Sequence, residues 1–182
     1  PSSPRSARGA FLLGLLLAAA PPSRPAAATP EVEWVLADVG QGDGALLRRG
    51  ATAMLVDGGG GTGQRRTRDF GVQVWLPLLA ARGITGLDAV VVTHGDSDHC
   101  GGLIDVASYL PVGEVWGAPE LRETACVREI LALSRADFRG LGAGERVTLG
   151  SLSFEVLGPQ RGAAGKDNDR SLVLALEAEG RR

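Results

Sequence analysis

Both histidines of the chain fall within one short segment, together with two aspartates. Residues 93–102 read Thr-His-Gly-Asp-Ser-Asp-His-Cys-Gly-Gly, and the candidate metal ligands in them are His94, Asp96, Asp98 and His99. Imidazole and carboxylate groups together suit Zn²⁺, Mn²⁺ or Fe²⁺, and four such groups this close in sequence can hold one ion or parts of two. Asp-Ser-Asp alone is also typical of a solvated turn. The clustering of both histidines favours the metal site.

A predicted strand and a predicted helix flank this segment. Residues 89–92 (Ala-Val-Val-Val) are apolar and mostly β-branched, as expected of a buried strand. Open α/β sheets place ligand sites in the loops that follow the carboxyl ends of their strands. The four side chains can therefore point into one cleft above the strand end. Residues 101–106 are predicted to open a helix whose amino end lies beside the metal.

The amino-terminal part of the domain predicts a strand, a glycine-rich turn and a β-hairpin. The strand lies within residues 31–38 and runs into the turn 38–44, whose glycines permit positive φ and from which Asp43 projects. Two further strands, 45–49 and 53–56, form a hairpin that ends at Asp57. No G-x-G-x-x-G sequence is followed by a helix here, so a dinucleotide cofactor is not expected.

The rest of the chain continues to mix strands and helices. Predicted helices lie around residues 74–80 and from Pro119, predicted strands at 114–116 and 172–176, a hairpin over 146–157, and a polar turn at 167–171. This mixture predicts one α/β domain that begins after residue 30 and extends to residue 182.

The composition restricts the classes of partner. The chain has 182 residues, 44% of them hydrophobic, with a formal net charge of −2 and only 4% aromatic residues. Such a chain is neither a basic nucleic-acid binder nor a base-stacking platform for single strands. A polyanion would have to be held locally or through metal ions. Arg65, Arg66 and Arg68 could contact phosphate, or could simply lie in a solvated loop.

Residues 1–30 differ from the rest of the chain. Two arginines precede a short apolar run, and a Pro/Ala-rich stretch follows it. The run is shorter than the roughly twenty residues that a spanning helix needs, and its flanks are typical of a secretory signal. The alternatives are the end of a membrane helix with an Ala/Pro linker, or a leader without a targeting role. Cys100 and Cys126 could pair in an oxidising compartment, while Cys100 could instead be a soft metal ligand or a small buried side chain.

Four motifs, in this order, resemble one known family. They are Asp-Val-Gly-Gln-Gly-Asp at 38–43, Val-Asp-Gly-Gly at 56–59, the segment at 93–102, and Asn-Asp-x-Ser-Leu-Val-Leu at 168–174. Together they resemble the metallo-β-lactamase-fold domain of ComEC-type competence proteins, the DNA-uptake channels of bacteria. The resemblance implies an αββα sandwich and a divalent metal cofactor, two ions of Mn²⁺ or Zn²⁺.

The resemblance also assigns roles to the metal segment. It implies that His94 and Asp96 serve one ion and that Asp98 and His99 serve the other, with Asp98 also helping to hold the attacking water. Most of the superfamily has a histidine where this chain has Asp96, and a carboxylate there favours Mn²⁺ or another oxygen-preferring ion.

Four further residues take supporting roles by the same resemblance. Asp43 and Asp57 would orient ligands or brace the loop. Asn168 and Ser171 would line the cleft, or merely cap a turn.

The family pattern continues with Thr-Gly-Asp and His-His-Gly-Ser segments, which do not occur before Arg182. We therefore expect 31–182 to be the amino-terminal portion of the fold, incomplete at its carboxyl end. The expected function is a metal-dependent hydrolase, an extracytoplasmic nuclease or phosphodiesterase linked to DNA uptake, tethered to a membrane or secreted. The alternatives are a catalytically inactive DNA-channel or interaction module of the same fold, and a secreted hydrolase of small substrates.

Overall fold

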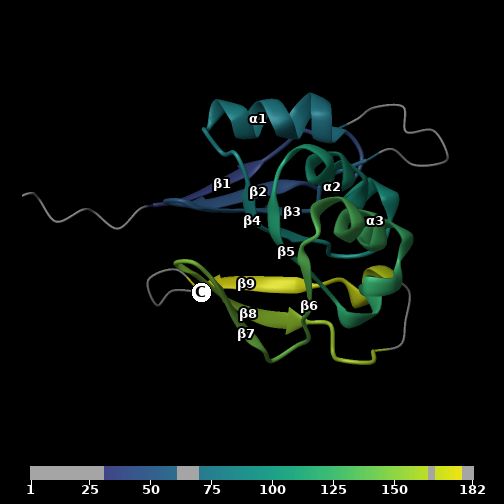
Figure 1. Cartoon of the computed structure of the whole chain (residues 1–182). Helices are drawn as coiled ribbons and strands as arrows, with labels where there is room; N and C mark the ends of the chain where they lie inside the picture. Colours follow the sequence, from purple (N-terminus) through teal and green to yellow (C-terminus); the bar gives the residue numbers. More distant parts are fainter. Residues whose placement is uncertain (1–30, 61–69, 164–166, 178–182) are drawn as a thin grey trace, which may run out of the picture.

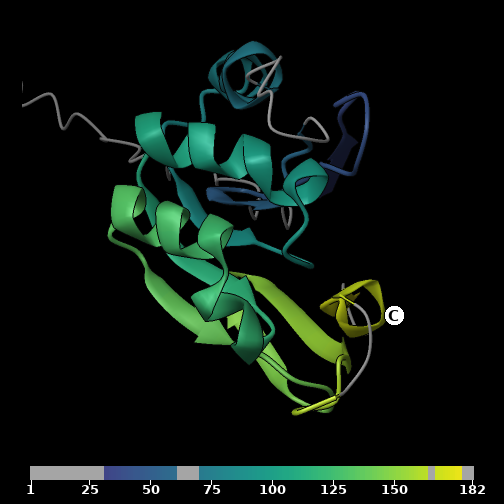
Figure 2. The ribbon, with the colours of Figure 1, turned by 90° about the vertical axis from the view of Figure 1, so that its right-hand side faces the viewer.

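Two β-sheets pack face to face, and the α-helices cover the outer face of the larger sheet (Figure 1). The computed structural model describes residues 31–60, 70–163 and 167–177. The same layers are visible in the perpendicular view, where α2 and α3 run side by side (Figure 2). This helix–sheet–sheet arrangement confirms the predicted α/β sandwich. Residues 1–30, and with them the predicted leader, lie outside the described residues.

The larger sheet has six strands in the order β1-β2-β3-β4-β5-β6. They are β1 (Val32–Leu36), β2 (Ala45–Arg49), β3 (Thr52–Val56), β4 (Leu87–Val91), β5 (Val112–Gly117) and β6 (Asp137–Gly140). The first three are antiparallel, whereas β3 to β6 run parallel. β4 is buried at almost every position, as expected of a parallel strand covered on both faces.

The smaller sheet has three antiparallel strands in the order β7-β8-β9. They are β7 (Arg146–Leu149), β8 (Leu152–Gly158) and β9 (Val173–Glu177). Burial alternates along β7 and along most of β8, so one face of this sheet packs against the larger sheet while the other faces outward.

The helices are η1 (Gly71–Trp75), α1 (Leu76–Ala81), α2 (Ser97–Tyr109), η2 (Pro119–Glu123), α3 (Ala125–Ser134) and η3 (Asp167–Arg170). All of the helices except η3 lie in the connections between the parallel strands, and η3 precedes β9. η1 runs directly into α1, and Pro77 is the second residue of α1, at the junction of the two helices. In the described part of the chain, no helix combines the length and hydropathy needed to cross a bilayer.

Each interface between layers has its own core. One lies between helices and sheet and includes the buried Trp75, Leu103 and Ile130. The second lies between the two sheets and includes Trp116 and Phe154, whose rings meet edge to face with centroids 5.8 Å apart. The two cores fix the larger sheet from both sides, which gives the strand ends that carry the polar side chains a rigid base.

Three local features differ from the sequence prediction. α2 begins at Ser97 rather than at residue 101, because Asp96 adopts an extended backbone and its carbonyl accepts the first amides of the helix. The helix predicted from Pro119 is two helices, since Thr124 is extended between η2 and α3. β6 was not predicted, because a four-residue edge strand alternating charged and half-buried residues carries little hydrophobic signal.

Candidate metal centre

Two neighbouring parallel strands bring the first polar residues together. Val56 at the end of β3 pairs with Val91 at the end of β4, and the chain leaves both strands at the same edge of the sheet. The Asp57 amide donates to the Val91 carbonyl at 2.9 Å, which keeps the two chains in register beyond the strand ends. Asp57 therefore lies beside Thr93 although the two are far apart in sequence.

The first turn of α2 brings His99 back over the same strand ends. The amide of His99 donates to the Asp96 carbonyl at 3.0 Å, and the His99 carbonyl accepts from the Gly58 amide. This close approach requires glycine, because a Cβ on Gly58 would lie 2.5 Å from the Leu103 amide nitrogen. The Val-Asp-Gly-Gly motif is thus what allows the helix to sit directly on the strand end.

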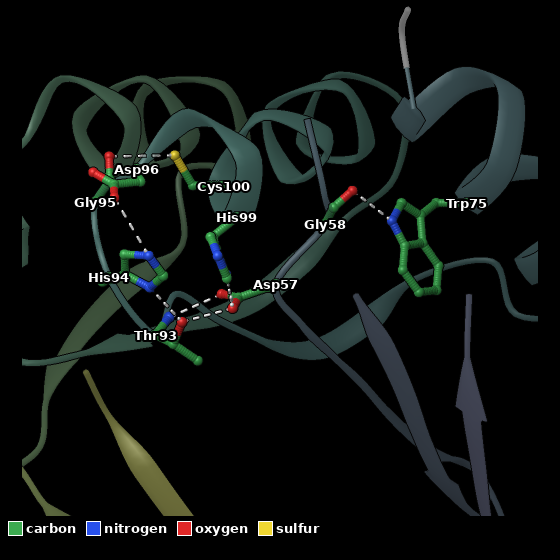
Figure 3. Close-up of polar contacts among 9 residues, drawn as sticks. All are labelled: Asp57, Gly58, Trp75, Thr93, His94, Gly95, Asp96, His99 and Cys100. Carbon is green, nitrogen blue, oxygen red and sulfur yellow. Dashed lines mark hydrogen bonds and ion pairs between the residues drawn. The ribbon is translucent and has the colours of Figure 1, made fainter. Parts of the chain in front are cut away.

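Asp57 is the centre of a hydrogen-bond network (Figure 3). Its side chain is 3% exposed. One oxygen accepts the Thr93 amide at 2.9 Å, and the other accepts the Thr93 hydroxyl at 2.6 Å and lies 2.8 Å from His99 Nδ1. Three partners on one buried carboxylate suit a group that fixes the orientation of its neighbours.

This network determines which nitrogen of each imidazole is free. The single proton of the Thr93 hydroxyl goes to Asp57, so this oxygen can only accept from His94 Nδ1, 3.0 Å away. His99 Nδ1 donates to Asp57 in the same way. In the neutral imidazoles, both Nε2 atoms therefore keep an unprotonated lone pair, which is the form that binds a metal ion.

The donor set fits a divalent cation. Asp57, His94 and His99 each offer a ligand atom, and the three atoms lie within 4.8 Å of one another. The two imidazole rings lie against each other with centroids 3.8 Å apart and an angle of 53° between their planes. His94 Nε2 lies 3.6 Å from the Asp96 carboxylate, which is half exposed at the rim of the site. Two imidazoles beside carboxylates are ligands for Zn²⁺ and Mn²⁺.

The pKa of His99 is raised above its ordinary value of 6.5. The hydrogen bond to Asp57 is the main cause, burial acts in the opposite direction, and the charges of Asp57, Asp98 and Asp43 raise the pKa further. A metal ion at His99 must therefore displace a proton that the surrounding carboxylates stabilise.

A cleft of about 460 Å³ opens over the network. Among the residues that line it are Asp43, Asp57, His94, His99 and Ser171. The structure therefore brings together five of the side chains that the sequence singled out. Leu172 anchors the last of them, because its amide donates to the Thr93 carbonyl at 2.9 Å.

The other predicted site residues lie around this cleft or outside the described part. Asp98 is half-buried in the first turn of α2, and its backbone packs so closely on Gly42 that a Cβ there would lie 1.6 Å from the Asp98 carbonyl oxygen. The arginines at 65, 66 and 68 lie outside the described residues, as does the side chain of Asn168.

Cys100 and Cys126 form a disulfide, which joins the first turn of α2 to α3. Cys100 is 1% exposed, and its sulfur lies 3.9 Å from the Gly95 carbonyl oxygen. Of the uses open to Cys100, the structure selects pairing over metal ligation. The disulfide fixes the turn that carries His99 to a second helix.

Sequence reasoning assigned no role to Thr93. Its position gives a signal in retrospect, since it is the hydroxyl residue between a buried strand and the first histidine. Trp75 was also missed as a support, and its indole N–H donates to the Gly58 carbonyl at 2.9 Å (Figure 3).

Residues 37–170 match the sequence pattern of the Metallo-beta-lactamase superfamily. The chain belongs to this superfamily. It is 29% identical over 169 residues to ComE operon protein 3 of Bacillus subtilis (strain 168), an alignment that covers 82% of this chain and 21% of that protein. It is 33% identical over 171 residues to Competence protein ComA of Neisseria gonorrhoeae, covering 91% of this chain and 21% of that protein.

The match to the ComEC-type competence proteins confirms the resemblance noted in the sequence. The chain spans about a fifth of the length of these curated relatives. Among solved structures, the subclass B3 metallo-β-lactamase MEM-A1 from a soil metagenome library aligns with a TM-score of 0.57 at 14% identity, over 84% of this chain and 56% of that one. This likeness supports the fold. Members of the superfamily generally depend on divalent metal, in agreement with the donor set described above.

Proposed function

We propose that this metallo-β-lactamase domain is a divalent-metal-dependent hydrolase of nucleic-acid phosphodiesters that acts outside the cytoplasm during DNA uptake. The observation that carries the proposal is the network in which Thr93 and Asp57 hold both imidazoles with Nε2 free. The similarity to two competence proteins supports the link to DNA uptake.

Each polar side chain has a proposed role. His94 and Asp96 would hold one ion, because His94 Nε2 lies 3.6 Å from the Asp96 carboxylate. Asp98 and His99 would hold a second, an assignment that rests on the sequence motif. Asp57 would orient the ligands rather than bind the ion, since its oxygens already have three partners within 2.9 Å.

Other residues would shape the cleft. Asp43 would brace the turn that carries it, because its carbonyl accepts the Gly59 amide at 2.8 Å. Ser171, which lines the cleft, would contact the substrate. Asn168 is proposed to do the same, and Arg65, Arg66 and Arg68 to contact phosphate; these four rest on sequence alone.

When bound, the metal lowers the pKa of a coordinated water and polarises the phosphoryl oxygen. The chain's own residues would position the attacking water and the substrate. The Asp98 carboxylate would accept a hydrogen bond from the attacking water and orient it toward the phosphorus. Hydrolysis forms one bond from the water oxygen to phosphorus and breaks one ester P–O bond. The products are a phosphomonoester and an alcohol, whose oxygen takes up the proton.

Two observations support a location outside the cytoplasm. The Cys100–Cys126 disulfide is a feature of proteins from oxidising compartments. Residues 1–30 have the composition of a secretory signal or of the end of a membrane helix. We propose that the domain is secreted or tethered at the outer face of a membrane.

The test combines metal content and cleavage. Purified 31–182 is analysed for bound metal and incubated with linear DNA and Mn²⁺, beside His94→Ala and Asp98→Ala variants. Metal binding with cleavage that both variants lose supports the proposal. Unchanged cleavage in either variant would remove its metal-site assignment, and metal binding without cleavage would favour an interaction module. Hydrolysis of a chromogenic cephalosporin but not DNA would favour a small-substrate hydrolase.

A further inference from the structure

A second cavity, of about 110 Å³, lies beside the metal cleft. It is lined by Gly95, Ala118, Glu120, Leu121, Thr124 and Arg170. None of these residues has a place in the function proposed above. The lining combines a cationic, an anionic and a hydroxyl side chain, from Arg170, Glu120 and Thr124.

The two cavities are built from the same two segments of chain. The metal cleft is lined by His94 and Ser171, and the second cavity by Gly95 and Arg170, their immediate neighbours in sequence. The hydrogen bond from the Leu172 amide to the Thr93 carbonyl holds these segments together. The two cavities are therefore lined by neighbouring residues of the same two segments.

The lining of the second cavity suits a phosphate group. The guanidinium of Arg170 is permanently charged and presents a planar set of donors that matches phosphate oxygens. Thr124 precedes α3, and its hydroxyl donates to the Leu121 carbonyl at 2.7 Å instead of capping the helix. The partial positive charge at the start of α3 adds to that of Arg170.

Glu120 sets the charge of the preferred ligand. Its side chain is exposed on the same lining, where its carboxylate opposes a second negative charge. A phosphodiester carries one negative charge, whereas free phosphate and phosphomonoesters approach two at neutral pH. The lining therefore favours an internal diester of a nucleic-acid strand over a terminal or free phosphate.

We infer that this cavity is a subsite for a phosphodiester adjacent to the one in the metal cleft, with Arg170 as the contacting residue. The inference rests on the proposed phosphodiesterase function. It explains how a chain with a net charge of −2 can hold a polyanion next to an acidic metal site. Selection of a strand over a single ester follows from filling both cavities at once.

The kinetic test compares a short oligothymidylate with bis(4-nitrophenyl) phosphate, which has a single phosphodiester and can therefore occupy only one of the two cavities at a time. Arg170→Ala should lower the ratio of kcat/KM for the oligonucleotide to kcat/KM for the single diester about tenfold, through KM. Arg170→Lys should recover part of this ratio, and Glu120→Gln should raise it. Arg128→Ala is the control: it removes an exposed positive charge that is part of α3 but does not line the cavity, and it should leave the ratio unchanged.

The binding test does not require turnover. Anisotropy of a labelled oligothymidylate with Mn²⁺ should show about tenfold weaker binding for Arg170→Ala, with the slope of log K against log salt reduced by about 0.7. Equal binding by Arg170→Ala and wild type, no binding by wild type, or inorganic phosphate that competes as well as a diester would overturn the subsite. Arg170-dependent binding without cleavage would leave the subsite standing while the hydrolase proposal fails.

Discussion

Replacement of Thr93 by valine tests whether one hydroxyl sets the state of both imidazoles. Valine has nearly the shape of threonine and keeps the amide that donates to Asp57 at 2.9 Å. It removes the donor to Asp57 at 2.6 Å and the acceptor for His94 Nδ1 at 3.0 Å. His94 is 6% exposed, so water replaces the lost partner poorly.

The expected loss has a thermodynamic part and a binding part. A hydrogen bond to a charged group contributes about 1.5–3 kcal/mol, so Thr93→Val should lower the free energy of unfolding of the metal-free protein by about 2 kcal/mol. Loss of a residue that orients metal ligands typically reduces metal affinity about 10- to 100-fold. Thr93→Ser keeps the hydroxyl and should retain most of both quantities.

Urea denaturation with chelator measures the first quantity, and competition with a chromophoric chelator measures the second. NMR of ¹⁵N-labelled histidine reads the tautomer directly, and His94 should carry its proton on Nδ1 in neutral wild-type protein. Wild-type metal affinity in Thr93→Val would refute the reasoning. A loss of metal affinity in Thr93→Ser as large as that in Thr93→Val would also refute it. A proton on Nε2 of His94 in the neutral wild-type protein would do the same.

Three further outcomes are expected. Gly42→Ala should destabilise the protein by at least about 2 kcal/mol in urea denaturation, because the φ of Gly42 is +85° and the new Cβ would meet the Asp98 carbonyl. Gly83→Ala is the control and should cost less, because Gly83 has a φ of +67° but no atom within 4 Å of the new Cβ. Equal losses in the two variants would contradict this reasoning. Cys126→Ser should lower the free energy of unfolding by about 3 kcal/mol, because the disulfide closes a separation of 26 residues. If reductant lowered the stability of the Cys126→Ser variant further, the disulfide would not be the cause. In metal-free protein, His99 has a raised pKa and stabilises the fold fully below about pH 6.5, and this contribution should be lost as pH rises through the folded-state pKa. Urea denaturation across pH should show the loss in wild type and a flatter profile in His99→Gln; parallel profiles would contradict the assignment.

Much of the fold follows from short-range patterns. The hairpin of β2 and β3 follows from two apolar runs around a glycine turn, and Gly83, at positive φ, lies just beyond the end of α1. These signals depend only on residues close together in the sequence, so they can be recognised without the structure. β6 is different, because it becomes a strand only through its pairing with β5. The hydrophobic pattern of its four residues gives no indication of that pairing.

The same distinction applies to the site. His94 and His99 are close in sequence, so their cooperation is visible in the motif. The role of Thr93 depends on Asp57, 36 residues away, and becomes apparent only when β3 and β4 lie in register. Pairing of Cys100 with Cys126 was one of the alternatives that the sequence left open, and choosing it needs α2 and α3 side by side. Contacts between distant residues are what the sequence alone could not supply.

The disulfide has a consequence for the order in which the domain matures. In the reduced protein Cys100 and Cys126 would be two free thiols, and thiolates attract soft ions such as Cu(I) or Zn²⁺. Pairing converts both sulfurs into poor donors and leaves imidazoles and carboxylates to receive the ion. Oxidation before loading therefore biases the domain toward harder ions. The compartment in which the domain folds would thereby influence which metal it can acquire.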